Sequence, residues 1–379
     1  MVRSLALGVA LLSALALARP DAATAQTKDD TVVYALQSDI DTWDPPGSVL
    51  REAIILGYNV YDHLAVRDLK TRKVVPNLAL SWKNIDDTTW EVKLRQGVKF
   101  HDGTPFTAKD VKATFDRVLD PAKKMIARGN HAKIKGVEIV DDNTVRFKTD
   151  GPYPLFVERL TAQVMESEKV IREKGDEWMQ EHPVGTGPYK LVSWHRKQEH
   201  LLVRNDDYWG PKPYYKYVRI RIIPEQATQI AELLSGGVDI IKAVPPDQMD
   251  VINKSGTART GTSPILRTSF IQLDQAARSG PNPFTDKRVR IAANLAPDQD
   301  AIIKHVLNGL GDRVATAINP MAFGWDPALK PYKQDLVRAK KLLAEAGYPN
   351  GVEVVFNEEP PTVEPAVQQT NDAIIADLT

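Results

Sequence analysis

One stretch of the chain brings residues with catalytic potential close together: KFHDGTPFTAKDVKATFDRV, which begins at Lys99. His101 stands beside Asp102, and the hydroxyl of Thr107 and the acid Asp110 follow. A histidine, a carboxylate and a hydroxyl are the side chains of a hydrolase triad, so acyl transfer is the first hypothesis to weigh. Sequence neighbours in an extended chain point to opposite faces, however, and this argues against a His101–Asp102 dyad.

The same residues also fit a turn that leads into a helix. Asp102-Gly103 is a typical turn pair. Thr107, with Asp110 three residues later and an apolar series from Val111 onward, has the spacing of a capping box. We therefore predict a strand, a turn and a capped helix here, and no catalytic residue.

Other chemical motifs are equally weak in this chain. The GTG of Gly185 and Gly187 lacks the third glycine of a dinucleotide fingerprint and the Gly-Lys-Ser/Thr ending of a nucleotide loop, and Pro188 removes a donor N–H. We interpret these three residues as a hinge or scaffold turn between domains. None of the seven histidines is spaced as in a metalloprotease helix, and no Gly-x-Ser-x-Gly elbow occurs. We expect no cofactor and no metal site.

The N-terminus carries the pattern of a secretory signal. Arg3 precedes an apolar run from Leu5 to Ala18, and the small residues Ala23 and Ala25 form a cleavage site. The run is shorter than the roughly 20 residues that a membrane-spanning helix needs. We predict a signal peptide over 1–25 with cleavage after Ala25, and hence a periplasmic protein.

Composition narrows the function classes further. The chain contains no cysteine, so it has no disulfide, no thiol nucleophile and no acceptor for a lipid anchor. Removal of 25 from the 379 residues leaves 354, with 47 basic and 48 acidic side chains. This balance argues against a nucleic-acid partner. The length allows two or more domains, and we expect a monomer.

Hydrophobic periodicity indicates an α/β chain. A strand, a helix and a short strand over 218–241 predict a parallel pair of strands. The other predicted strands lie at 32–36, 90–94, 145–147, 265–274 and 352–356, and the other predicted helices at 52–64, 107–118, 286–296, 297–311, 336–347 and 365–379.

Several segments, in order along the chain, resemble the large extracytoplasmic solute-binding proteins of ABC importers (family 5, the dipeptide, oligopeptide and nickel-binding type). The matching segments are VVPNLALSWKNIDDTTWEVKLRQGVKFHDGTPFTAKDVKATFDRV, VGTGPYKLVSW, NDDYWG, AELLSGGVDI, NPFTDKRVRIAANLAPDQDAIIKHVLNGLG and YKQDLVRAKKLLAEAGYPNG.

The resemblance implies a two-lobed periplasmic-binding-protein fold of class II type with an extra domain. Lobe I is then built from 26–59 and 184–262, the hairpin-rich extra domain from 60–183, and lobe II from 263–379. Family members continue for more than a hundred residues, so we expect the C-terminal part of the fold to be missing here.

The resemblance also implies where a ligand binds. The turn with Gly47, Ser48 and Arg51 matches a ligand-lining segment. Apart from the resemblance, tryptophans are core residues by default, but Trp43 stands beside turn residues after the first strand and is the one most readily placed at a ligand. A second set consists of Gln272, Asp274 and Gln275 at the start of lobe II. Arg51 could equally be a solvated helix-start charge, and Asp274 could cap a turn.

Dipeptide-binding members have an arginine and a tyrosine in a later loop, where this chain has Pro361 and Val363 with Glu358 and Glu359 nearby. A guanidinium clamp for a ligand carboxylate is therefore not visible, which weakens a free dipeptide as the ligand.

The function that follows is capture of a peptide or peptide-like solute between two lobes and its delivery to ABC transporter permease subunits. The alternatives are a secreted hydrolase with an unrecognised acidic pair, or a non-functional truncated fragment of a binding protein.

Overall fold

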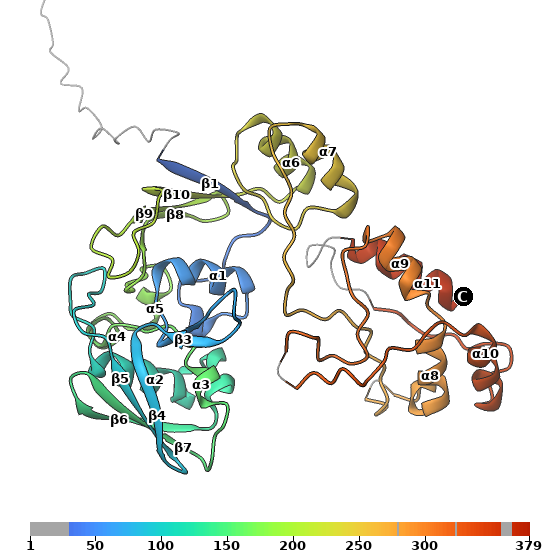
Figure 1. Ribbon diagram of the computed structural model, residues 1–379, viewed down its shortest axis with the longest axis horizontal. Helices are drawn as coiled ribbons and strands as arrows, with labels where there is room; N and C mark the ends of the chain where they lie inside the picture. The colour runs from blue at the N-terminus through green and yellow to red at the C-terminus, as the bar shows by residue number, and fades with distance from the viewer. Residues whose placement is uncertain (1–29, 279, 323, 358–365) are drawn as a thin grey trace, which may run out of the picture.

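The computed structural model describes residues 30–278, 280–322, 324–357 and 366–379. Two four-stranded sheets and one two-stranded sheet lie in the N-terminal two thirds of the described chain, and α8 to α11 gather apart from them (Figure 1). The predicted signal peptide lies outside the described residues. Among those residues, no helix is long and apolar enough to cross a membrane.

The first sheet has the strand order β1-β10-β9-β8. β1 pairs with β10 in parallel, and the remaining pairs are antiparallel. Its core joins the sheet to α1 through Leu36, Leu56, Tyr61, Leu202 and Ile220. The bounds are β1 Thr31–Leu36, β8 Tyr189–His195, β9 Glu199–Arg204, β10 Tyr217–Ile222, α1 Arg51–Val60 and α6 Gln226–Ser235.

Of the two parallel strands predicted on either side of α6, only β10 forms; the second is reduced to an isolated parallel bridge at Ile240, and the two are not neighbours. Ile240 makes a parallel bridge with Tyr34 on β1, and β1 pairs with β10 on its other side. The backbone N–H of Ala35 donates to the Ile240 carbonyl at 3.0 Å. The N-terminal strand therefore inserts between the two, which a local sequence pattern cannot show.

The second large sheet has the order β4-β5-β7-β6, entirely antiparallel. Helix α2 covers it with Val111, Phe115 and Val118, all fully buried. The Phe115 ring meets Phe147 edge to face, with the centroids 4.9 Å apart. The bounds are β2 Ala65–Arg67, β3 Val74–Pro76, β4 Ala79–Asp86, β5 Thr89–Leu94, α2 Ala108–Leu119, β6 Ile134–Asp141, β7 Thr144–Thr149, α3 Phe156–Arg159, α4 Glu168–Glu173 and α5 Gly175–Met179.

The described residues after Ile222 form helices and connecting segments. α8 and α10 pack through Ala292, Leu295 and Ala339, and the Asp298 N–H donates to Asp377 at 2.8 Å, which ties α9 to α11. The bounds are α7 Met249–Lys254, α8 Lys287–Leu295, α9 Gln299–His305, α10 Leu336–Glu345 and α11 Val367–Leu378.

The strands predicted at 265–274 and 352–356 are absent, so both predictions are wrong for this structure. A strand needs a hydrogen-bonded neighbour, and no described segment pairs with either stretch. Two predicted helices are also shorter than expected: α1 ends at Val60 and α9 at His305. After Val60 the backbone becomes extended at Tyr61, and His63 forms a bridge with Val164.

Candidate functional site

The turn between β1 and α1, together with the first residue of α1, contains four of the predicted ligand residues. Ser48 is buried, and its hydroxyl donates to Asp41 at 2.7 Å while accepting the Leu50 N–H at 3.0 Å. Gly47 ends the short 3-10 helix η1, Pro45–Gly47. Arg51 is exposed as the first residue of α1. These contacts make the turn a preformed support for Arg51.

Trp43 lies beneath this turn in the core instead of on its surface. Its side chain is only 1% exposed, and its ring meets His200 edge to face at 5.4 Å between centroids. The Tyr61 hydroxyl donates to the Trp43 carbonyl at 3.2 Å. In this conformation Trp43 shapes the turn from below and offers no surface to a ligand.

Sequence reasoning missed the apolar surface beside Arg51. Val49 is 71% exposed, and Ile54, Ile55 and Tyr58 on α1 are 40 to 50% exposed. Exposed apolar side chains that are contiguous with a charged group are typical of binding surfaces. The sequence contained a signal for this exposure. On a helix of 3.6 residues per turn, these three residues lie on a different face from Ala53, Leu56 and Val60, which form the buried stripe.

An ion pair borders the same surface. Lys242 pairs with Glu52, the second residue of α1. Burial tends to raise the pKa of Glu52, but the hydrogen bond from Lys242 lowers it overall. Burial and the nearby Glu52 charge raise the pKa of Tyr34 to about 12, so this phenol is neutral at physiological pH. No sequence signal places Lys242 beside α1, because the pairing depends on the chain path.

The second predicted group lies in the segment that precedes α8. Gln272 and Gln275 are exposed. Asp274 organises a turn: its carboxylate accepts the Arg278 N–H at 3.1 Å and the Asn282 amide at 3.5 Å. The structure thus gives Asp274 the turn-capping role that the sequence left open, while a ligand contact by this group stays a prediction.

The GTG segment packs against the end of α1. A Cβ built on Gly185 would lie 2.0 Å from the Val60 carbonyl oxygen, and one on Gly187 would lie 2.5 Å from the Val60 carbonyl carbon. Neither glycine has a positive φ, so close backbone approach explains them. Pro188 follows at the start of β8, and its carbonyl accepts the Asn205 N–H at 2.8 Å.

His101 is bound to this junction and not to a nucleophile. Its Nδ1 accepts the Gly185 N–H at 3.4 Å, and its Nε2 lies 3.0 Å from the Gly187 carbonyl oxygen, to which it donates. Burial lowers the pKa of His101 to about 4. Asp102 instead accepts the N–H and the hydroxyl of Thr104, at 3.0 and 2.6 Å. The predicted turn is confirmed.

The predicted capping box at the start of α2 is also confirmed. The Thr107 N–H donates to the Asp110 carboxylate at 2.8 Å, and the Thr107 hydroxyl accepts the Lys109 N–H at 3.3 Å. Each member of the suspected triad therefore has a structural partner.

Asp62 is a buried carboxylate that sequence reasoning did not single out. It accepts hydrogen bonds from the Thr186 hydroxyl and the Trp209 indole, both at 2.9 Å, and from Tyr208 at 3.3 Å. Burial raises the pKa of Asp62, and these donors partly offset the rise. The segments VGTGPY and NDDYWG thus meet at one buried acid, which fixes the junction between the two large sheets.

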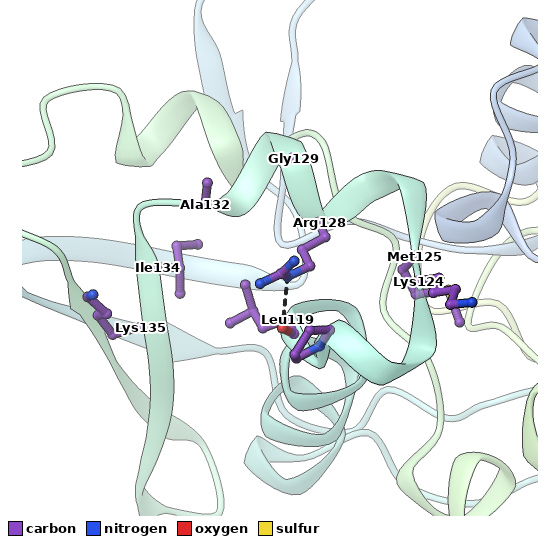
Figure 2. A pocket seen from close by; sticks show the side chains of 9 residues that line it. Leu119, Lys124, Met125, Arg128, Gly129, Ala132, Ile134 and Lys135 are labelled. Atoms are coloured by element: carbon purple, nitrogen blue, oxygen red, sulfur yellow. Dashed lines mark hydrogen bonds between the residues drawn. The ribbon is translucent and has the colours of Figure 1, made fainter.

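A surface hollow of about 660 Å³ lies on the sheet unit with α2 (Figure 2). It is lined by Leu119, Pro121, Lys124, Met125, Arg128, Gly129, Ala132, Ile134 and Lys135. Figure 2 shows Arg128 in its middle, where the guanidinium donates to the Leu119 carbonyl at 3.2 Å. None of the predicted ligand residues lines this hollow.

Within the described ranges, no group of three or more metal-ligating side chains converges on one point. The residues that replace the arginine and tyrosine of dipeptide-binding members, Pro361 and Val363 with Glu358 and Glu359, lie outside the described residues.

Comparison with known proteins gives a consistent picture. Residues 73–379 match the family described as bacterial extracellular solute-binding proteins, family 5 Middle. The glutathione-binding protein GsiB of Escherichia coli K12 is 31% identical over 354 residues, which make up 92% of this chain and 65% of GsiB. GsiB of Shigella flexneri shows the same identity and coverage. This chain therefore spans less than two thirds of the length of these curated relatives.

Two solved structures are similar over 92% of this chain. The periplasmic binding protein DppA from Helicobacter pylori, in complex with the peptide STSA, has 28% identity and a TM-score of 0.76, and 72% of it is covered. AgaA from A.tumefacien R10, in complex with agropinic acid, has 29% identity and a TM-score of 0.74, and 70% of it is covered. The predicted α/β fold of the two-lobed periplasmic-binding-protein type is confirmed.

Proposed function

Because this chain belongs to the bacterial extracellular solute-binding proteins of family 5, we propose that it captures a peptide or peptide-like solute between two lobes and delivers it to ABC transporter permease subunits. The family match over 73–379 is the single observation that carries the proposal. GsiB is named for glutathione and the DppA structure holds the peptide STSA, and both of these ligands are of the proposed class.

We assign the lobes as the sequence predicted them: 26–59 and 184–262 to lobe I, 60–183 to the extra domain and 263–379 to lobe II. The tight packing of Gly185 and Gly187 on Val60 supports a scaffold role for this junction. Closure between lobes I and II, which such binders use to enclose a ligand, then moves the segment after α7.

We place the ligand on the surface that carries Arg51, with Gly47 and Ser48 shaping its edge and Gln272, Asp274 and Gln275 approaching from lobe II. The exposed guanidinium of Arg51 supports binding of a carboxylate, and the apolar residues of α1 beside it support contact with a peptide side chain. Trp43 contributes from the core by holding the turn.

The protein in this proposal is periplasmic, with a signal peptide over 1–25, and it works as a monomer without a lipid anchor, a cofactor or a nucleic-acid partner. It binds its solute without converting it.

Thermal unfolding in the presence of glutathione and of the peptide STSA tests this function. A ligand at one hundred times its Kd stabilises the folded state by about 2.7 kcal/mol, so the unfolding temperature rises with concentration. Arg51→Ala should lose most of this rise. Arg172→Ala, an exposed arginine paired with Glu168 on α4, is the matched control and should keep it.

Mass spectrometry of the recovered ligand separates a binder from the hydrolase alternative. Intact ligand agrees with the proposal, whereas fragments that disappear in an acid-to-alanine variant would replace it with an enzyme. If neither ligand raises the unfolding temperature, the proposed function is contradicted. If Arg51→Ala and Arg172→Ala keep the same rise, the assigned surface is contradicted.

A further inference from the structure

Arg117 on α2 joins three segments through one buried ionic cluster. The side chain is 1% exposed, and its guanidinium makes ion pairs with carboxylates from three segments. The partners are Asp44 at 2.6 Å, Glu166 at 2.7 Å and Asp176 at 2.7 Å. Asp44 and Glu166 are themselves buried, at 3% and 0% exposure.

The cluster contains more negative than positive charge. Lys123 reaches Asp176 at 2.7 Å, so the outer carboxylate has its own cation. Asp44 and Glu166 share the guanidinium of Arg117: Nη1 lies 3.0 Å from Asp44 Oδ1 and 2.9 Å from Glu166 Oε2. Two buried carboxylates at one site do not both ionise easily, and one proton relieves their repulsion.

Tyr61 and Thr114 also face the cluster, and neither adds positive charge. The phenol of Tyr61 is fully buried near both carboxylates and Arg117, and burial raises its pKa well above the usual range. The Thr114 hydroxyl bonds to the Glu166 backbone, accepting its N–H at 3.0 Å. Burial, opposed by Arg117 and reinforced by Asp44, raises the pKa of Glu166 well above its ordinary value.

Asp44 links this cluster to the predicted ligand turn. Its carbonyl accepts the Gly47 N–H at 3.0 Å, and this bond closes η1. Both Asp44 carboxylate oxygens meet the same guanidinium, with Nη1 and Nη2 donating at 3.0 and 2.6 Å. A bidentate contact of this kind fixes orientation as well as position. Arg117 therefore holds the start of the turn through Asp44, and Ser48 holds its end through Asp41 and the Leu50 N–H.

We propose that Arg117 is a positioning residue for the 44–48 turn, and that a proton retained on Glu166 completes the contact. The inference rests on the proposed function for the meaning of the turn, but its test uses no ligand. When Glu166 loses this proton as pH rises, repulsion between the two carboxylates loosens Asp44 and with it the turn.

Hydrogen exchange of the 44–51 backbone in the full chain, followed by mass spectrometry across neutral and alkaline pH, measures this directly. Rates are corrected for the intrinsic pH dependence of exchange. Arg117→Lys keeps the charge and loses the bidentate geometry, so exchange in 44–51 should rise about tenfold while peptides of β6 and β7 stay unchanged. Asp116→Asn, an exposed carboxylate of the same helix that pairs with Lys112 outside the cluster, is the control and should leave 44–51 unchanged.

The pH profile of Glu166→Gln separates the proposed proton from a merely structural role of this residue. The amide is neutral at every pH, so this variant should match the wild type near neutrality and lose the alkaline rise in 44–51 exchange. An unchanged rise in Glu166→Gln, or unchanged 44–51 exchange in Arg117→Lys, would overturn the inference. If Arg117→Lys loosens every segment alike, the Glu166→Gln pH profile decides alone.

The two proposals fail separately. Loss of ligand binding with the expected exchange pattern contradicts only the proposed function. Ligand binding without that pattern contradicts only the role of Arg117.

Discussion

His101 has catalytic potential, but in this structure its ring joins two backbone groups of the GTG segment. Its neutral ring has one acceptor nitrogen and one donor nitrogen, and the Gly185 N–H and the Gly187 carbonyl satisfy both. A second proton would turn the acceptor Nδ1 into a donor that faces the Gly185 N–H. Folding therefore favours the neutral ring, in agreement with the pKa of about 4 that burial imposes.

These two hydrogen bonds of the neutral His101 ring predict a pH dependence of stability. The folded-state pKa of His101 lies below the ordinary value of 6.5, so the unfolded chain binds more protons between pH 6.5 and about 4. The contribution is fully present above pH 6.5 and is lost as pH falls toward 4. His101→Gln can keep both hydrogen bonds without titrating, and its free energy of unfolding should decline less over this range.

Denaturant unfolding at several pH values measures the effect. His63 and His131, whose pKa values are also lowered to about 4 by burial, keep a residual slope in the variant. His195→Gln, at an exposed position at the end of β8, controls for the loss of an imidazole. If the free energy of unfolding of His101→Gln changes with pH as steeply as that of the wild type, His101 does not make the contribution described here.

At the scale of elements, the junction between α1 and the GTG segment sets the geometry of the binding surface. The backbones of Val60 and Gly185 approach so closely that no side chain fits between them. Because Val60 ends α1, any shift here moves the helix that carries Arg51 and its apolar neighbours.

Gly185→Ala should therefore destabilise the fold strongly. The added methyl would meet a backbone oxygen, which cannot rotate away as a side chain can, and we expect a loss of about 3 kcal/mol. Gly129→Ala is the matched control, because nothing lies within 4 Å of its built Cβ and its φ is not positive. Urea unfolding of both variants checks the prediction, and equal stabilities would refute the close-approach account.

Local patterns predicted the elements whose stability is local or amphipathic. The capping box of Thr107 and Asp110 and the alternation in β5, β7 and β10 correspond to the observed elements because each signal acts within a few residues. The stretches 265–274 and 352–356 have strand composition without a strand, since pairing depends on a distant partner.

The candidate site was predictable only in part for the same reason. The turn with Gly47 and Ser48 follows a recognisable strand, so its place in the fold was accessible from sequence. The pairing of Lys242 with Glu52 and the cluster around Arg117 join residues that only the chain path brings together. Trp43 was expected near a ligand, but its ring packs in the core with residues of β9 and α1.

On the scale of the whole molecule, the proposed function needs surfaces from two parts of the chain. Arg51 and the exposed residues of its helix belong to the first part, and Gln272 and Gln275 belong to the segment before α8. The helices α8 to α11 lie apart from the sheets and α1 (Figure 1). The buried acids Asp62 and Glu166 lie at internal junctions, where they bind neighbouring elements together. Both carboxylates thus have structural partners.

Native mass spectrometry of the full chain with a defined mixture of short peptides tests the central claim most directly. We expect complexes with one intact peptide per chain, and these complexes should weaken in Arg51→Ala and persist in Arg172→Ala. Absence of any peptide complex, or release of cleaved peptides from the mixture, would contradict the claim that this protein binds peptide solutes without converting them.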